Sequence, residues 1–254
     1  MQPTISSTSA QRLLDTYADH HVSPRYFALA IVAITLQTLA DIRVVLLGCP
    51  YINRPNEAGA DTIGLHLEPL PLRFTLPNSS EPTRIVERLL QAVGTTAQAA
   101  VAHAVPWHAL LALLGLPFPS GHEALFDYAV TFWEYRGVKD SQRLPDTEGL
   151  VPLPVSPNGA IFALLFEWRF TDDEQGVSLR LGYDTDLLSP ALMNELSRVL
   201  CVALDNMLDL EKQTRLRHVL RQALDDACLR AGLKPLSVRE LARKNLIETV
   251  SGDV

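Results

Sequence analysis

The sequence is poor in the features that mark secreted, disulfide-bonded or nucleic-acid-binding proteins. It has three cysteines, Cys49, Cys201 and Cys228, with neither a C-x-x-C spacing nor an even number for pairing. A reducing, cytoplasmic setting is the simplest expectation. The first residues lack the basic end and apolar run of a secretory signal. A net charge of −7 without a basic cluster makes nucleic acid a poor partner.

Long apolar runs are missing too. The longest stretch, residues 27–39, is interrupted by Thr35, Gln37 and Thr38. It is too short and too polar to span a bilayer, so we expect a buried helix there and no membrane partner.

Signatures of metal and nucleophile sites are equally scarce. The sequence has no H-E-x-x-H, no C-x-x-C and no G-x-S-x-G. His103 and His108 are five residues apart with Pro106 between them, which is a poor spacing for a shared metal ion. We therefore expect no metal site and no bound cofactor.

The chain does have enough apolar residues for a substantial core, because they make up 47% of its 254 residues. Ser23 followed by Pro24 predicts the start of a helix that runs to about Ala40. This helix is apolar nearly all round, so it should be covered on most sides. A shorter helix over residues 9–18 is expected to lead into it.

A β-branched run at residues 44–48 predicts a central strand covered on both faces, followed by a loop over 49–55. Residues 62–74 predict a second strand with a bend, because Pro69 and Pro71 cannot donate ladder hydrogen bonds. The other expected elements are helices over 80–103, 106–114 and 190–208, a strand over 125–135 with Phe126, Tyr128, Val130 and Phe132 on one face, and a hairpin of strands 161–171 and 177–183.

This order predicts a mixed β-sheet with packed helices, an α/β lobe of the layered α+β kind. We expect a lead-in helix over residues 1–22, the main lobe over 23–210, and a helical, charged tail or linker over 211–254. The tail should break at residues 232–235.

Five segments follow the order and rough spacing of known motifs. They are residues 44–55 (G-x-P-x-x-N-R), 63–73 (I-G-x-F-x-N-x-x-P-L-R), 103–107 (H…P-F), 125–132 (L-F-D…F) and 181–188 (Y-D-x-x-L-F). With them, residues 22–208 resemble the C-terminal lobe of a nonribosomal-peptide-synthetase condensation domain. Each motif is weak alone, and the set is fairly specific.

The resemblance implies a chloramphenicol-acetyltransferase-like fold, in which two similar lobes enclose a tunnel. It implies an acyltransferase role in secondary-metabolite biosynthesis: a carrier-bound acyl or peptidyl thioester is joined to an acceptor amine. Both substrates would be presented on phosphopantetheine arms of peptidyl or aryl carrier protein domains. The other implied partners are an N-terminal condensation lobe and further synthetase domains.

The sequence departs from the family pattern at the catalytic motif and at one position of the second motif. The catalytic motif H-H-x-x-x-D-G belongs to the other lobe, and the pair His20 and His21 lacks the following Asp-Gly. We interpret that pair as a coincidence. The Asn of the second motif is replaced by Glu68 or Pro69. The lone lobe is therefore expected to be inactive by itself.

The resemblance assigns Asn53, Arg54, Gly64 and Arg73 to the interface between lobes or to structural support. Arg54 is the most specific of these candidates. The resemblance implies that it faces the Asp of the H-H-x-x-x-D-G motif across a semi-buried interface between the lobes, and a guanidinium can hold that carboxylate with two parallel hydrogen bonds. Gly64 is expected at a bulge or a close approach of backbones. Arg73 is interpreted as a solvated strand end or a support of the bridging segment.

Pro106, Trp107 and Phe132 are expected to face the tunnel or a carrier domain. His66 and Glu68 lie two residues apart and share one face of a strand, where they could form an acid/base pair. A solvated pair is the more usual case.

Three functions stay open at this point. The chain is half of a condensation domain, a non-catalytic module that binds a carrier or complements the other lobe, or a stand-alone acyltransferase that uses His66 and Glu68. The first predicts an exposed apolar patch near residues 50–55 and 65–72, larger than a soluble monomer normally tolerates.

Overall fold

The computed structural model describes residues 23–52, 67–75, 85–116, 125–134, 162–170, 177–209 and 216–234. Its strands form one mixed sheet in the order β2-β1-β3-β4-β5. The elements are, in order, α2 (Pro24–Ala40), β1 (Val44–Ile52), β2 (Leu67–Thr75), α4 (Ile85–Ala102), α5 (Trp107–Leu113), β3 (Tyr128–Glu134), β4 (Leu164–Phe170), β5 (Val177–Tyr183), α6 (Pro190–Met207) and α7 (Leu216–Arg230).

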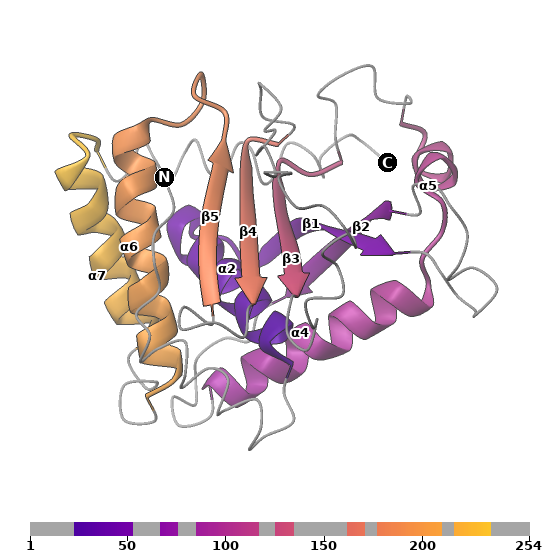
Figure 1. Cartoon of the computed structure of the whole chain (residues 1–254), viewed down its shortest axis with the longest axis horizontal. Coiled ribbons are helices and arrows are strands. Elements are labelled where there is room, and N and C mark those ends of the chain that lie inside the picture. The colour runs from indigo at the N-terminus through magenta and orange to yellow at the C-terminus, as the bar shows by residue number, and fades with distance from the viewer. Residues whose placement is uncertain are drawn as a thin grey trace, which may run out of the picture.

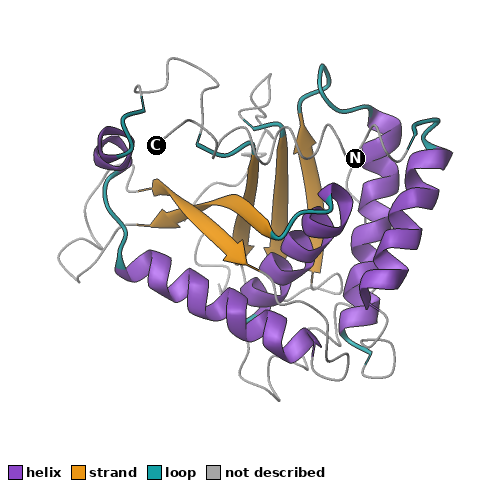
Figure 2. Cartoon of the chain, turned by 180° about the vertical axis from the view of Figure 1, so that it is seen from behind, coloured by secondary structure: helices purple, strands orange, loops and turns teal. Residues whose placement is uncertain are grey.

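The sheet mixes two kinds of pairing. Strands β1 and β2 are antiparallel, β3 is parallel to both β1 and β4, and β4 and β5 form an antiparallel hairpin. Figure 1 shows β3, β4 and β5 in front of α2, and the reverse view in Figure 2 shows α2 and α4 in front of the sheet. The predicted mixed sheet with packed helices is confirmed.

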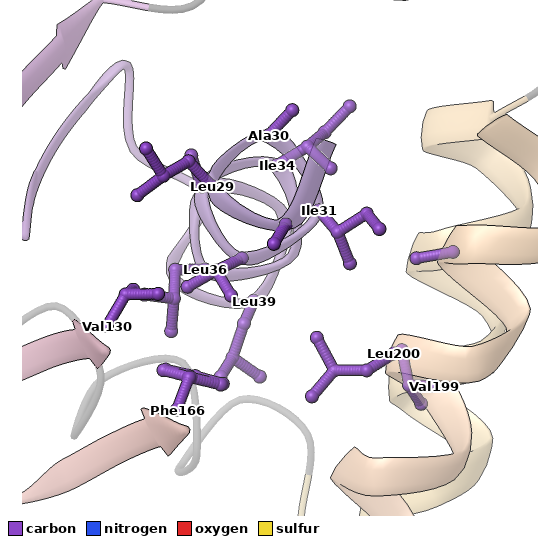
Figure 3. Close-up of a cluster of buried hydrophobic side chains, with 14 of the residues drawn as sticks. Leu29, Ala30, Ile31, Ile34, Leu36, Leu39, Val130, Phe166, Val199 and Leu200 are labelled. Carbon is purple, nitrogen blue, oxygen red and sulfur yellow. The ribbon is translucent and has the colours of Figure 1, made fainter. Parts of the chain in front are cut away.

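Helix α2 is the centre of the core, and its predicted bounds are confirmed. The Ser23 hydroxyl accepts a hydrogen bond from the Arg25 amide at 3.3 Å, which caps the start as expected. The helix ends at Asp41 in the left-handed region, with φ 57°. From Phe27 to Ala40 every residue is buried. Figure 3 shows side chains of α2 pointing toward the sheet on one side and toward α6 on another.

Helices α6 and α7 lie side by side and pack against α2 (Figure 1). Helix α6 begins after Ser189, whose hydroxyl accepts from the Leu192 amide at 3.2 Å. The buried stripe of α7 belongs to the same core as the sheet. The domain boundary at residue 210 stays a prediction, but residues 216–230 are part of the folded body rather than a detached linker. The stripe consists of Leu216, Leu220, Leu224, Ala227 and Cys228.

Polar contacts tie α7 to the end of α2. The Arg217 guanidinium donates to the side-chain carbonyl of Gln37 at 3.0 Å, and Arg221 forms an ion pair with Asp41 at 2.5 Å. Partial burial lowers the pKa of Arg217. After α7 the chain turns at Gly232 with φ 73°, where the break was predicted.

Strand β1 corrects one prediction, because it continues through Cys49, Pro50 and Tyr51 to Ile52. The loop predicted from residue 49 was wrong over 49–52. Within the described residues β1 pairs with β3 only at Gly48, opposite Ala129. Beyond Gly48, β1 pairs only with β2 among the described strands. Pro50 therefore does not interrupt a ladder between β1 and β3.

The pairing of β2 with β1 continues past Pro69 and Pro71, where the sequence predicted a bend. The register runs without a break from Leu67 opposite Ile52 to Thr75 opposite Val44. Among the described strands β2 lies at the edge of the sheet, a position where proline is tolerated because its missing amide hydrogen interrupts no ladder between those strands. Residues 62–66 lie outside the described residues.

Strand β3 begins at Tyr128, later than predicted, and its alternation places Tyr128 and Val130 in the core. Phe126 precedes the strand and does not share that face. Its ring lines a cavity together with Ala129 and Thr131, the residues of opposite parity. Phe126 was expected to share one face of the strand with Tyr128, Val130 and Phe132, and that expectation was wrong for Phe126.

Candidate functional site

A groove of about 850 Å³ opens beside the first turn of α2. Five segments build it: the start of α2, the end of β1, strand β2, the last turns of α4, and Phe132 of β3. Its floor is apolar, formed by residues such as Leu29, Leu70 and Leu72. Leu67 is 47% exposed at the rim. The apolar patch predicted near residues 50–55 and 65–72 stays a prediction.

One charged side chain lines the groove among the described residues. It belongs to Arg25, in the first turn of α2 and exposed at the rim. Its guanidinium carbon lies 5.9 Å from the centre of the Phe132 ring, a cation–π distance. Tyr26, Tyr51 and Gln98 add hydroxyl and amide groups to the same wall. The groove thus combines an apolar floor with a basic rim.

Cys49 lines the groove from the end of β1. Burial raises the pKa of its thiol to about 12, and the nearby positive charge of Arg25 offsets only part of that rise. The thiol is therefore protonated at neutral pH. Because the thiolate is the nucleophilic form, Cys49 is not suited to attack a thioester.

A second, smaller cavity of about 180 Å³ lies against the same two strands and shares Cys49, Pro50 and Leu67 with the groove. It is roofed by Phe126, whose ring lies directly over Gly48. A Cβ atom added at Gly48 would be 1.7 Å from Cε2 of that ring. Position 48 therefore requires glycine, because the Phe126 ring occupies the space that a Cβ atom would need.

Aromatic contacts hold the Phe126 ring in place. Phe162 stacks on it with ring centres 5.9 Å apart, and Trp107 meets it edge-on at 5.9 Å. The Trp107 amide donates to the carboxylate of Glu68 at 3.1 Å. Glu68 therefore caps the start of α5, which fixes Trp107 beside Phe126.

The structure separates the residues that were expected to face a tunnel. Phe132 lines the groove, whereas Trp107 packs on Phe126 and Pro106 is exposed at the start of α5. Arg73 is exposed on β2. The candidates Asn53, Arg54, Gly64 and His66 lie outside the described residues, as do His20 and His21.

The three tryptophans differ in placement. Trp168 is 1% exposed in the core, while Trp133 is 48% exposed at the end of β3. Trp107 is half-buried. Over the described ranges no group of three His, Cys, Asp or Glu residues could hold a metal ion. Within those ranges, too, no helix has the length and apolar character to cross a membrane.

The sequence did not single out several residues of the groove. Arg25, Tyr26 and Gln98 lie outside the motifs, and Tyr51 stands at a variable position of the first one. These residues come together only because five segments meet in the fold. The one local signal was the Ser23-Pro24 helix start, because the first turn of α2 that follows it lines the groove.

A family model described as "Condensation domain" matches residues 2–222. The chain belongs to the condensation-domain family. This match ends inside α7, beyond the predicted boundary at residue 210.

Relatives of this condensation-family chain include two fungal proteins. The nonribosomal peptide synthetase echPS of Aspergillus ruber is 32% identical over 250 residues, covering 96% of this chain and 12% of that protein. The nonribosomal peptide synthetase criC of Aspergillus cristatus is 35% identical over 228 residues, covering 87% of this chain and 10% of that protein. The chain thus spans about a tenth of the synthetases it matches.

Solved structures share the fold at low sequence identity. The first condensation domain of the calcium-dependent antibiotic synthetase superposes with a TM-score of 0.57 and 15% identity, covering 82% of this chain and 44% of that one. The X-domain from teicoplanin biosynthesis gives a TM-score of 0.59 and 19% identity, covering 82% and 45%. These neighbours confirm the chloramphenicol-acetyltransferase-like fold expected for the lobe.

Proposed function

We propose that this chain supplies the C-terminal lobe of a condensation domain, which joins a carrier-bound acyl or peptidyl thioester to an acceptor amine. The observation that carries the proposal is the share of each chain that superposes when this chain is compared with a solved condensation domain. Most of this chain, 82%, superposes on less than half, 44%, of a solved condensation domain. A domain of two similar lobes is expected to give such a ratio when one lobe is matched.

The groove is our candidate for this lobe's share of the tunnel. Its wall includes Cys49, Pro50 and Tyr51, which immediately precede the Asn53-Arg54 motif in the chain. Its volume of about 850 Å³ falls in the range of small-molecule sites, about 300–1,000 Å³. An apolar floor with a few polar groups at the rim suits an acyl chain or an amino-acid side chain.

Two further parts of the proposal concern partners. Carrier protein domains would present both substrates on phosphopantetheine arms, and a second lobe would contribute H-H-x-x-x-D-G, which this sequence lacks. Arg54, with Asn53, Gly64 and Arg73 in support, would face that lobe. Catalysis then depends on the second lobe because its histidine is the group able to move the proton of the amine.

A reconstitution assay tests the proposal. The chain is mixed with an N-terminal lobe from a fungal condensation domain that carries H-H-x-x-x-D-G, and amide formation is followed from an acyl thioester and a free amine. We expect turnover from the mixture, none from either part alone, and loss of turnover with Arg54→Ala. His218→Ala, at an exposed position outside the groove and the five motif segments, is the matched control and should leave turnover unchanged.

The stand-alone acyltransferase gives the opposite result in the same assay. The chain would then turn over by itself, and His66→Ala would abolish that activity. The contact from the Trp107 amide to Glu68 already gives Glu68 a structural task, which weighs against a free acid/base pair. A lobe that binds its partner without turnover in any mixture would instead identify an interaction module.

A further inference from the structure

The smaller cavity, of about 180 Å³, lies where β1 and β3 separate. Within the described residues these strands pair only at Gly48, opposite Ala129. Ala129 and Thr131 line the cavity and alternate along β3 with Tyr128 and Val130 of the core. Because successive side chains of a strand point to opposite faces, this cavity lies on the sheet face that points away from the core. The floor of the groove, by contrast, is made of core residues.

The described lining of this cavity contains one hydroxyl, that of Thr131. Its oxygen, Oγ1, is buried and has no hydrogen-bond partner in the described part of the chain. The other polar side-chain group is the weakly polar thiol of Cys49, which lies 3.8 Å from the carbonyl oxygen of Pro50. A buried hydroxyl without a partner is costly, so a ligand atom that bonds to Thr131 Oγ1 would recover that cost.

The remainder of the lining favours a flat apolar ligand. Phe126 and Phe162 are stacked with ring centres 5.9 Å apart and planes at 25°, and the rings of Pro50 and Pro69 complete the walls. An added aromatic ring gains stacking or edge contacts beyond the area that it buries. The volume slightly exceeds the roughly 150 Å³ of an apolar cavity that binds one benzene molecule. One six-membered ring with a small substituent therefore fits.

The Phe126 wall is held in place before any ligand enters. The backbone of Gly48 meets the ring on one side, and Trp107 meets it edge-on at 5.9 Å. The Trp107 amide is in turn bound to the carboxylate of Glu68 at 3.1 Å. A wall fixed in this way reduces the ordering that binding would require.

We propose that the smaller cavity is a second binding site, which takes a phenol-type group: one aromatic ring against Phe126 and Phe162, with its hydroxyl bonded to Thr131 Oγ1. Thr131 then determines which rings are preferred. The inference goes beyond the function proposed above, which concerns the groove and does not depend on this cavity.

Three probes titrated into the whole chain test the proposal. Phenol and benzene differ in the hydroxyl, and phenol and cyclohexanol differ in the aromatic ring. Amide shifts in NMR spectra give the affinities and should locate the site at Ala129 and Thr131. We expect phenol to bind about fivefold more tightly than benzene, the size of one net hydrogen bond. Cyclohexanol should bind several-fold more weakly than phenol, because it lacks the ring contacts.

Variants assign the preference to one hydroxyl. Thr131→Val keeps the shape and suits a strand, but it leaves the phenol hydroxyl buried without a partner. Phenol should then bind at least about tenfold more weakly, and benzene should become the better ligand. Thr131→Ser restores a hydroxyl and should restore the preference for phenol. Ser178→Ala removes a hydroxyl from β5, outside the described lining, and should change neither affinity. Thermal unfolding checks that each variant is folded.

Two sources present this chemistry: a free phenol and the side chain of a tyrosine-like substrate. N-acetyltyrosinamide distinguishes them. Binding at least as tight as that of phenol, with shifts at the same amides, assigns the cavity to a side chain. Exclusion of this larger molecule assigns it to free phenols.

Several results would overturn the proposal. Benzene binding as tightly as phenol to the wild-type chain, or a phenol preference that survives in Thr131→Val, would remove the role of Thr131. Cyclohexanol binding as well as phenol would remove the aromatic selection. If no probe shifts the amides of Ala129 and Thr131, the cavity is not a binding site. The reconstitution assay is independent of these measurements, so the lobe assignment stands or fails by turnover alone.

Discussion

The two ends of α2 are built in opposite ways. At its C-terminal end, which we call the closed end, helices α6 and α7 cover it, and Arg217 and Arg221 reach Gln37 and Asp41. At its N-terminal end, the open end, the first turn borders a groove of about 850 Å³ and carries the exposed Arg25. One helix is therefore covered at one end and borders an open groove at the other.

This contrast has a physical reason. A helix that is apolar nearly all round must be covered over most of its length, because each buried apolar side chain contributes about 1.5–3 kcal/mol when it leaves water. The one charged residue of α2, Arg25, lies in its first turn after the capping Ser23, whereas the polar residues near the other end, Thr35, Gln37 and Thr38, are buried. The sequence thus sets which end can stay open, and the packing of α7 seals the other.

The largest effect is expected at the closed end. Leu220 is fully buried between α7 and the core, so Leu220→Ala should lower the free energy of unfolding by about 2–5 kcal/mol. Leu229→Ala, on the same helix but 64% exposed, should change it by less than about 0.5 kcal/mol. Urea unfolding of both variants gives the comparison. Equal effects would mean that α7 does not seal the core.

The next effect concerns the strand that separates the open end from the smaller cavity. Gly48→Ala places a Cβ atom within the ring of Phe126 and should destabilise the fold by about 1–3 kcal/mol. Gly182→Ala is the matched control in β5, because its nearest contact would be an ordinary 3.7 Å to Leu165. That variant should be neutral or slightly stabilising. Adding Phe126→Leu to Gly48→Ala should restore part of the loss in thermal unfolding.

A smaller effect is expected where α5 joins the sheet edge. Glu68→Ala removes the acceptor of the Trp107 amide and should cost about 1 kcal/mol, as the loss of other helix caps does. Glu68→Gln keeps a side-chain oxygen at that position and should lose less. Tryptophan fluorescence of the native state reports whether Trp107 keeps its place. Identical stabilities for the two variants would contradict the capping role.

The smallest effect is expected from the ion pair between Arg221 and Asp41. Both side chains are substantially exposed, 40% and 51%, so the pair should contribute only about 0.2–1 kcal/mol. A double-mutant cycle with Arg221→Gln and Asp41→Asn measures the coupling, and Asn keeps the left-handed turn accessible. The coupling should fall further in salt. A coupling above 2 kcal/mol at physiological salt would show that this polar pair, rather than the leucine stripe, seals the closed end.

The core was predictable from the sequence, and the open end largely was not. The Ser-Pro start and the apolar run of α2 are local signals, and so are the alternation of β4 and β5 and the Ser189 cap of α6. The groove depends on five segments that meet only in the fold, so Arg25 and Tyr51 carried no signal. The loop predicted from Cys49 was wrong at Cys49 and Pro50, and only the pairing pattern shows why Pro50 is tolerated in β1.

The prediction for Phe126 failed for a related reason. Alternation applies within a strand, and Phe126 comes two residues before β3 begins, where the backbone is free to turn the ring over Gly48. A glycine in β1 and an aromatic residue upstream of β3 are complementary, but nothing in either local sequence links them.

The outer strand β2 has a consequence for how this lobe can associate with other chains. Pro69 and Pro71 have no amide hydrogen, so the β2 edge, the outermost of the described strands on that side, offers an incomplete row of donors to an incoming strand. An exposed sheet edge risks joining the edge of another sheet, and prolines at these positions disfavour that association.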